Sequence, residues 1–183
     1  EMCIRDRVYS LKQTSGELVW QKKIGARISA DLQILEDALF FGAADSAFYK
    51  LSPKTGETLA KLKVGIVPIG RPALGEAGAY FYLSEGGLMG QGRGLALVAT
   101  PGFLQNIRWS HEESYRWSAT KPRIYNSLLL TGTTTGEIIA FDLQTGVEAW
   151  QVFAEGSIRS IGVAEGFLYV GTIEGVVYKI DPK

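Results

Sequence analysis

Short apolar runs alternate with polar, glycine-containing turns along most of the chain. The clearest stretch covers residues 128–150, in which three apolar runs are separated by turns that end at Gly136 and Gly146. Apolar runs bounded by such turns predict strands, and turns this tight predict antiparallel pairing. In the second turn, the side chains of Asp142 and Thr145 can bond to the turn backbone, while Gly146 supplies a positive φ at no steric cost.

The same kind of turn recurs at a nearly constant spacing. A glycine closes a short polar turn at Gly16, Gly56, Gly102 and Gly146, so the steps are 40, 46 and 44 residues. Each step has room for about four strands of five or six residues joined by tight turns. The period therefore predicts repeated four-stranded antiparallel sheets, which is the content of one β-propeller blade.

A second sequence feature, a glycine at the end of an apolar run, recurs in step with the turn glycines. Gly42, Gly132 and Gly171 each end an apolar run and precede another strand-like segment, which in the last two repeats ends at Asp142 and Asp181. Two landmarks in phase are much harder to obtain by chance than one, so the repeat is a property of the whole chain.

One motif also carries a resemblance to a known family. The pattern Asp142-x-x-Thr145-Gly146-x-x-x-Trp150 resembles the PQQ-like repeat family of β-propellers, and nearly the whole chain after residue 7 fits it. The resemblance assigns structural roles to Gly16, Trp20, Gly42, Gly56, Gly132, Asp142, Thr145, Gly146, Trp150, Gly171 and Asp181.

In that family, the tryptophan four residues after the turn glycine docks between neighbouring blades. The resemblance therefore implies this role for Trp20 and Trp150. Two repeats depart from the pattern, because Ala60 and Asn106 stand at the tryptophan position. Trp109 is close enough to Asn106 to take over its role after a local shift.

The repeats also predict how the chain is divided. We interpret residues 1–7, which include Cys3, as the read-through of a sequencing adapter and leave them out of the fold prediction. The PQQ-like region, 8–183, comprises a partial blade at 8–24, complete blades at 27–63, 68–111 and 116–153, and a partial blade at 157–181. The predicted fold is an all-β open arc of about four blades. The resemblance implies that this arc is part of a larger propeller with seven or eight blades.

Charge and hydropathy narrow the function classes. The chain has 19 basic and 19 acidic residues, a formal net charge of zero and no basic run, so we expect no nucleic-acid partner. No apolar segment approaches the roughly 20 residues of a membrane-spanning helix, so we expect no transmembrane segment.

Two irregular loops interrupt the regular turns. Residues 85–94 form a glycine-rich loop whose spacing fits neither a P-loop nor a dinucleotide-binding motif, and 109–117 is dense in aromatic and ionisable residues. His111 precedes Glu112 and Glu113, but adjacent side chains on an extended strand point to opposite faces and do not converge on a metal.

Strand counting places both loops on one face of the arc. This face is the candidate interaction surface, and the alternative is that both loops are neutral insertions. The candidate residues are Arg93, Arg108, Trp109, His111, Tyr115, Arg116 and Trp117.

Three function classes fit the sequence. The first is a non-enzymatic binding or scaffold propeller of the cell envelope with a protein partner or an extended ligand, as in the outer-membrane assembly lipoproteins of the family. The resemblance then implies a periplasmic or other extracytoplasmic location.

The second class is a fragment of a quinoprotein dehydrogenase, which would use PQQ and calcium. The third is a WD40-type propeller. The first is favoured, with no catalytic, metal or cofactor-binding residue assigned, because the chain has no adjacent cysteine pair and no Trp-Asp dipeptide.

Overall fold

The computed structural model describes residues 6–35, 37–65, 67–75, 78–84, 92–99, 107–111 and 121–182. All of the regular structure in these ranges is β-strand. The strands form five separate antiparallel sheets, each built from consecutive strands.

The sheets follow one another along the chain. The first contains β1 (Arg7–Leu11) and β2 (Leu18–Lys23). The second contains β3 (Gln33–Leu35), β4 (Ala38–Ala43), β5 (Ala47–Leu51) and β6 (Thr58–Lys63). The third contains β7 (Val67–Gly75), β8 (Gly78–Ser84), β9 (Gly92–Ala99) and β10 (Ile107–His111). The fourth contains β11 (Arg123–Tyr125), β12 (Leu128–Gly132), β13 (Glu137–Asp142) and β14 (Glu148–Phe153). The fifth contains β15 (Ile158–Ala164), β16 (Phe167–Thr172) and β17 (Val177–Ile180).

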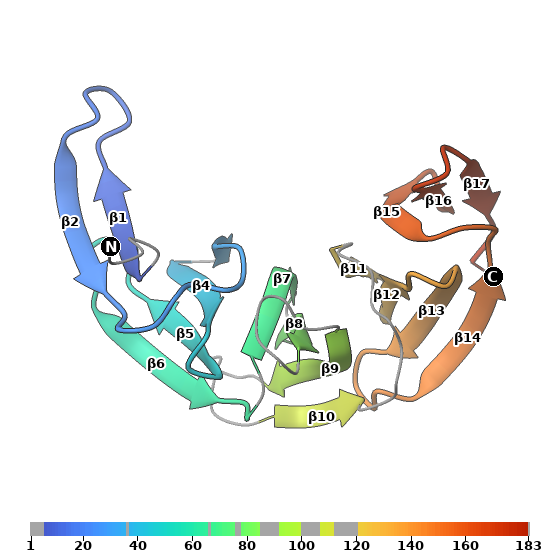
Figure 1. Cartoon of the computed structure of the whole chain (residues 1–183), viewed down its shortest axis with the longest axis horizontal. Helices are drawn as coiled ribbons and strands as arrows, with labels where there is room; N and C mark the ends of the chain where they lie inside the picture. The colour runs from blue at the N-terminus through green and yellow to red at the C-terminus, as the bar shows by residue number, and fades with distance from the viewer. Residues whose placement is uncertain are drawn as a thin grey trace.

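The five sheets stand side by side in an open arc. Figure 1 shows β7, β11 and β15 on the concave side and the fourth strands β6, β10 and β14 along the convex side. The sheets touch through their inner strands, where β4 contacts β7 and β12 contacts β15. The predicted fold class, an all-β open arc of four-stranded propeller blades, is confirmed.

The core lies between sheets because the middle strands are buried on both faces. Every residue of β4 is buried, and Ile138–Phe141 of β13 are fully buried. Each large apolar side chain buried in this way contributes about 1.5–3 kcal/mol. The outer strand β6 instead alternates half-buried and exposed positions, as expected for a strand with one wet face. Buried apolar side chains of the middle strands therefore hold neighbouring blades together.

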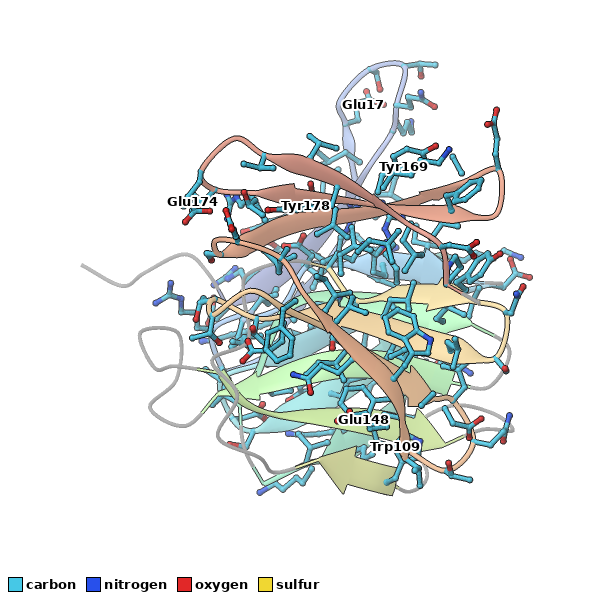
Figure 2. All side chains as sticks on the ribbon, turned by 90° about the vertical axis from the view of Figure 1, so that its right-hand side faces the viewer. Glu17, Trp109, Glu148, Tyr169, Glu174 and Tyr178 are labelled. Atoms are coloured by element: carbon cyan, nitrogen blue, oxygen red, sulfur yellow. The ribbon has the colours of Figure 1, made fainter. Side chains whose placement is uncertain are left out.

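The last sheet is also attached through the segment that leads into it. The backbone N–H of Glu155 donates to the hydroxyl of Tyr178 at 3.1 Å, and that of Ser157 donates to Oε1 of Glu174 at 3.3 Å. Figure 2 looks onto this end of the arc and labels both acceptor residues on the last sheet. These bonds hold the connection between the fourth and fifth sheets against the fifth.

The glycine turns adopt the conformation that the sequence predicts. Gly16, Gly56 and Gly146 have φ of 71°, 71° and 72°. In the last of these turns, Oδ1 of Asp142 accepts hydrogen bonds from the backbone N–H of Gln144 at 3.0 Å and of Thr145 at 2.8 Å. The side chain of Asp142 therefore supplies the hydrogen bonds that close the turn.

Several strand boundaries differ from the prediction. Strand β1 begins at Arg7, inside the segment that was left out as an adapter remnant. In the blade predicted at 27–63, the first strand, β3, begins only at Gln33. Before β3, Ile28 forms an isolated bridge to Ala43 of the same sheet, and Ala30 forms one to Gly70 of the third sheet. This segment therefore pairs both within its own blade and with the next one.

Candidate functional site

The predicted interaction surface is only partly described by the structure. Tyr115, Arg116 and Trp117 lie outside the described residues, as do most of the glycine-rich loop residues 85–94. The remaining candidates lie in strands: Arg93 belongs to β9, and Arg108, Trp109 and His111 belong to β10. The interpretation of 109–111 as loop is therefore wrong, because these residues pair with Leu95–Leu97 of β9.

Trp109 docks onto the next blade and does not line a loop surface. Its Nε1 donates a hydrogen bond to the carbonyl oxygen of Leu143 at 3.2 Å, and its ring lies 6.4 Å from that of Phe141. A Cβ atom on Gly146 would lie 2.5 Å from Cδ2 of Trp109, so the indole lies flat on the glycine. Figure 2 shows Trp109 at the outer edge of the arc, near Glu148 of β14.

Trp20 makes the same contacts two junctions earlier, between the first and second sheets. Its Nε1 donates to the carbonyl oxygen of Pro53 at 3.0 Å, and a Cβ atom on Gly56 would lie 2.7 Å from Cε3 of its indole. In both cases the acceptor is the second residue of the glycine turn in the following blade. The turn glycine is needed for its positive φ and for this close approach.

Trp150 also packs between blades, but its indole finds no hydrogen-bond acceptor among the described residues. Its indole packs against a buried cluster that includes Ile138 of its own sheet and Ile161 and Leu168 of the fifth sheet. Among the described residues, no group accepts from its buried Nε1. Pro182 follows β17 at the repeat position of Pro53, but this part of the chain forms no bond to the indole.

Three basic side chains lie on or next to the inner strands of the third and fourth sheets. Arg71 belongs to β7, Arg123 to β11, and Lys121 precedes Arg123 by two residues. Lys121 and Arg123 share one side of an extended segment because side chains alternate, whereas the intervening Pro122 is buried. We call Arg71, Lys121 and Arg123, with the nearby Asp31, the inner-rim cluster.

Two members of the cluster make contacts across sheet boundaries. Nε of Arg71 lies 3.9 Å from Oδ2 of Asp31, whose backbone N–H donates to the carbonyl oxygen of Gly70 at 2.9 Å. Nε of Arg123 donates to the carbonyl oxygen of Ile161 on β15 at 3.0 Å. The cluster therefore spans the junctions between the second, third, fourth and fifth sheets.

Lys121 lies in the most electropositive part of this cluster. Partial burial lowers the pKa of Lys121, and the charges of Arg71 and Arg123 lower it further, while Asp31 acts in the opposite direction. Both causes disfavour the charged ammonium. Among the described residues, Asp31 is the one carboxylate that acts on Lys121. One negative charge therefore faces three positive charges, which leaves an excess of positive charge.

Sequence reasoning did not find the inner-rim cluster, because its members come from separate repeats. The charge count is balanced over the whole chain and does not show a local excess. A signal was nevertheless present, since the dipeptides Arg71-Pro72 and Lys121-Pro122 place a basic residue before a buried proline in successive blades.

Within the part of the chain that the structure describes, no helix is long and apolar enough to cross a membrane. The four-stranded sheets, the repeated glycine turns and the tryptophans docked between blades define a propeller built from PQQ-like repeats. The family model described as outer membrane protein assembly factor BamB matches residues 3–183, and the chain belongs to this family. No curated protein sequence matches the chain.

Solved structures share the fold at low sequence identity. BamB from Moraxella catarrhalis superposes with a TM-score of 0.73 at 15% identity, covering 91% of this chain and 50% of that chain. The computationally designed protein Ika8 gives 0.72 at 14% identity, covering 97% and 53%. Sqt1 from Saccharomyces cerevisiae gives 0.70 at 17% identity, covering 96% and 52%. The chain thus spans about half the length of these structures.

Proposed function

We propose that the protein is a non-enzymatic scaffold propeller of the bacterial cell envelope that binds a protein partner. The observation that carries the proposal is the family match over residues 3–183. The family's description refers to outer membrane protein assembly, which is a task of protein–protein recognition in an extracytoplasmic compartment.

The construction of the blades supports a scaffold role. The central strands are filled by apolar side chains, and the tryptophans and glycines between blades serve packing. Repeats of this kind stack into extended concave surfaces, which suit large ligands better than small ones. We therefore expect binding to use the concave side and the face that carries the irregular loops.

Stoichiometric complex formation by the full-length protein tests this function. Affinity-tagged protein, recovered from detergent-solubilised envelopes, should hold one partner at a fixed ratio through gel filtration. Trp117→Ala removes an aromatic side chain from the candidate loop face and should weaken that complex, whereas Lys54→Gln, on an exposed turn, should not. Loss of the partner with both variants, or with neither, would contradict the loop face as the binding surface.

A cofactor titration separates the scaffold from a quinoprotein dehydrogenase. With PQQ and calcium added, the scaffold proposal expects no stoichiometric uptake of PQQ and no oxidation of alcohols or sugars. Saturable PQQ binding together with turnover would replace the scaffold function by the enzymatic one.

A further inference from the structure

The inner-rim cluster presents positive charge that the described protein does not neutralise. Arg71 is half exposed and its carboxylate neighbour Asp31 is 67% exposed, so the 3.9 Å pair is a weak surface contact. Arg123 uses its Nε to bond to a backbone carbonyl, which carries no full charge. No hydrogen bond or ion pair joins Lys121 to any residue in the described ranges.

Holding these cations together is unfavourable unless an anion joins them. Like charges close to each other disfavour the ionised state, and partial burial removes some of the water that would screen them. The backbone nevertheless fixes the arrangement, through the Asp31 to Gly70 bond and the Ala30 to Gly70 bridge on one side and the Arg123 to Ile161 bond on the other. Basic side chains with excess positive charge, carried on backbone segments that are fixed in this way, are suited to recognise carboxylates.

We propose that the inner-rim cluster binds carboxylate side chains of an acidic segment of a protein partner, with Lys121 as the central contact and Arg71 as a second donor. This inference rests on the proposed scaffold function and assigns the chemistry of one contact within it. A carboxylate placed between Lys121 and Arg71 would neutralise the charge that Asp31 leaves uncompensated.

The choice of an acidic protein segment follows from where the cluster lies. Its basic members lie on or next to β7 and β11, which Figure 1 shows on the concave side, and the side chain of Arg71 is 54% exposed, so an extended chain with several carboxylates can reach them. A free anion such as inorganic phosphate would satisfy one point of the cluster only. Electrostatic complementarity of this kind sets specificity and association rate.

Binding of a labelled acidic peptide tests the proposal directly. Fluorescein-labelled hexaglutamate is titrated with the 183-residue chain, and anisotropy is measured at low and at physiological salt. The expected result is saturable binding that weakens with salt and that Lys121→Gln and Arg71→Gln each reduce by about three- to tenfold. Lys54→Gln removes the same charge from an exposed turn and should leave the affinity unchanged.

A chemical footprint of Lys121 provides a second readout that does not depend on affinity. Acetylation by acetic anhydride, followed by mass spectrometry, should slow at Lys121 when hexaglutamate is present and should be unchanged at Lys54. Equal weakening by Lys54→Gln, absence of protection at Lys121, or competition by phosphate as strong as by the peptide would each overturn the proposal. If the envelope partner still binds the Lys121→Gln variant normally, the scaffold function stands and the assignment of this contact fails.

Discussion

Trp109 and Leu143 are joined across a blade boundary by a 3.2 Å hydrogen bond from the indole Nε1 to the backbone carbonyl oxygen. Trp20 and Pro53 form the same bond at 3.0 Å two junctions earlier. Each indole also lies on the glycine that closes the turn. At these two junctions, blade-to-blade contact on the convex side therefore depends on three elements: an indole, a turn carbonyl and a glycine without a side chain.

The turn glycines provide a matched test of this contact. Gly146→Ala introduces a methyl group 2.5 Å from the Trp109 indole at a φ of 72°, whereas Gly16→Ala has nothing within 4 Å at a φ of 71°. Both variants should lose about 1–2 kcal/mol for the left-handed backbone, and Gly146→Ala should lose about 1–3 kcal/mol more from overpacking. Urea unfolding measures both. Equal losses would contradict the docking geometry.

The hydrogen bond of the indole can be separated from its packing. Trp20→Phe removes a donor and leaves the carbonyl of Pro53 without that bond, so we expect a loss of about 1 kcal/mol beyond the change in packing. Trp150→Phe removes a buried N–H that has no acceptor among the described residues and should cost less than Trp20→Phe. A larger loss for Trp150→Phe would show that its Nε1 is bonded in solution.

Asp45 gives a prediction for acid unfolding. Burial raises the pKa of Asp45, but hydrogen bonds from Lys61 and Tyr49, both at 2.7 Å to Oδ2, outweigh it and lower the pKa below its ordinary value of 3.8. A lowered pKa in the folded state means that stability is fully present above the ordinary value and is lost as pH falls through the folded-state pKa. Asp45→Asn should cost up to about 1 kcal/mol near neutral pH.

The difference between Asp45→Asn and the parent protein should shrink as pH falls below about 4, because the carboxylate is then protonated in the unfolded chain, and should be lost once pH is below the lowered folded-state pKa. Urea unfolding at pH 7 and pH 3 measures this difference. A gap that stays constant with pH would show that the carboxylate charge contributes nothing.

Ser29 tests the contact between the second and third sheets on the concave side. Its Oγ donates a buried hydrogen bond to the carbonyl oxygen of Pro68 at 2.7 Å. Ser29→Ala leaves a buried carbonyl without this bond and should cost about 1–3 kcal/mol in urea unfolding. Ser10→Ala, on β1, is the control and should be near neutral, since its hydroxyl makes no hydrogen bond within the described residues.

The fold could be predicted from the sequence because its signals are local and repeated. The turns at Gly16, Gly56 and Gly146 fix the period, and each turn needs only its own residues to form. The docking role of Trp109 was harder to assign, because the tryptophan stands seven residues after Gly102 and not four. The pairing of β10 with β9 has an irregularity between Ile107 and Trp109, which accommodates the displaced position of the tryptophan.

The inner-rim cluster was beyond sequence reasoning for a different reason. Arg71 and Lys121 are 50 residues apart, and nothing in either segment states that β7 and β11 will contact each other. Their proximity is created by the stacking of whole blades. Pairwise electrostatics of this kind becomes visible only when the tertiary arrangement is known.

Ala60 is paired with Lys50 in the same register that pairs Trp20 with Ser10 and Trp150 with Ala140, so a methyl group stands where other blades carry an indole. The junction after β6 is held instead at its inner edge, by Ser29 on Pro68 and by the bridge from Ala30 to Gly70. The junction between the second and third sheets is therefore set by the contacts of β3, β4 and β5 with β7, and it does without an indole at this repeat position.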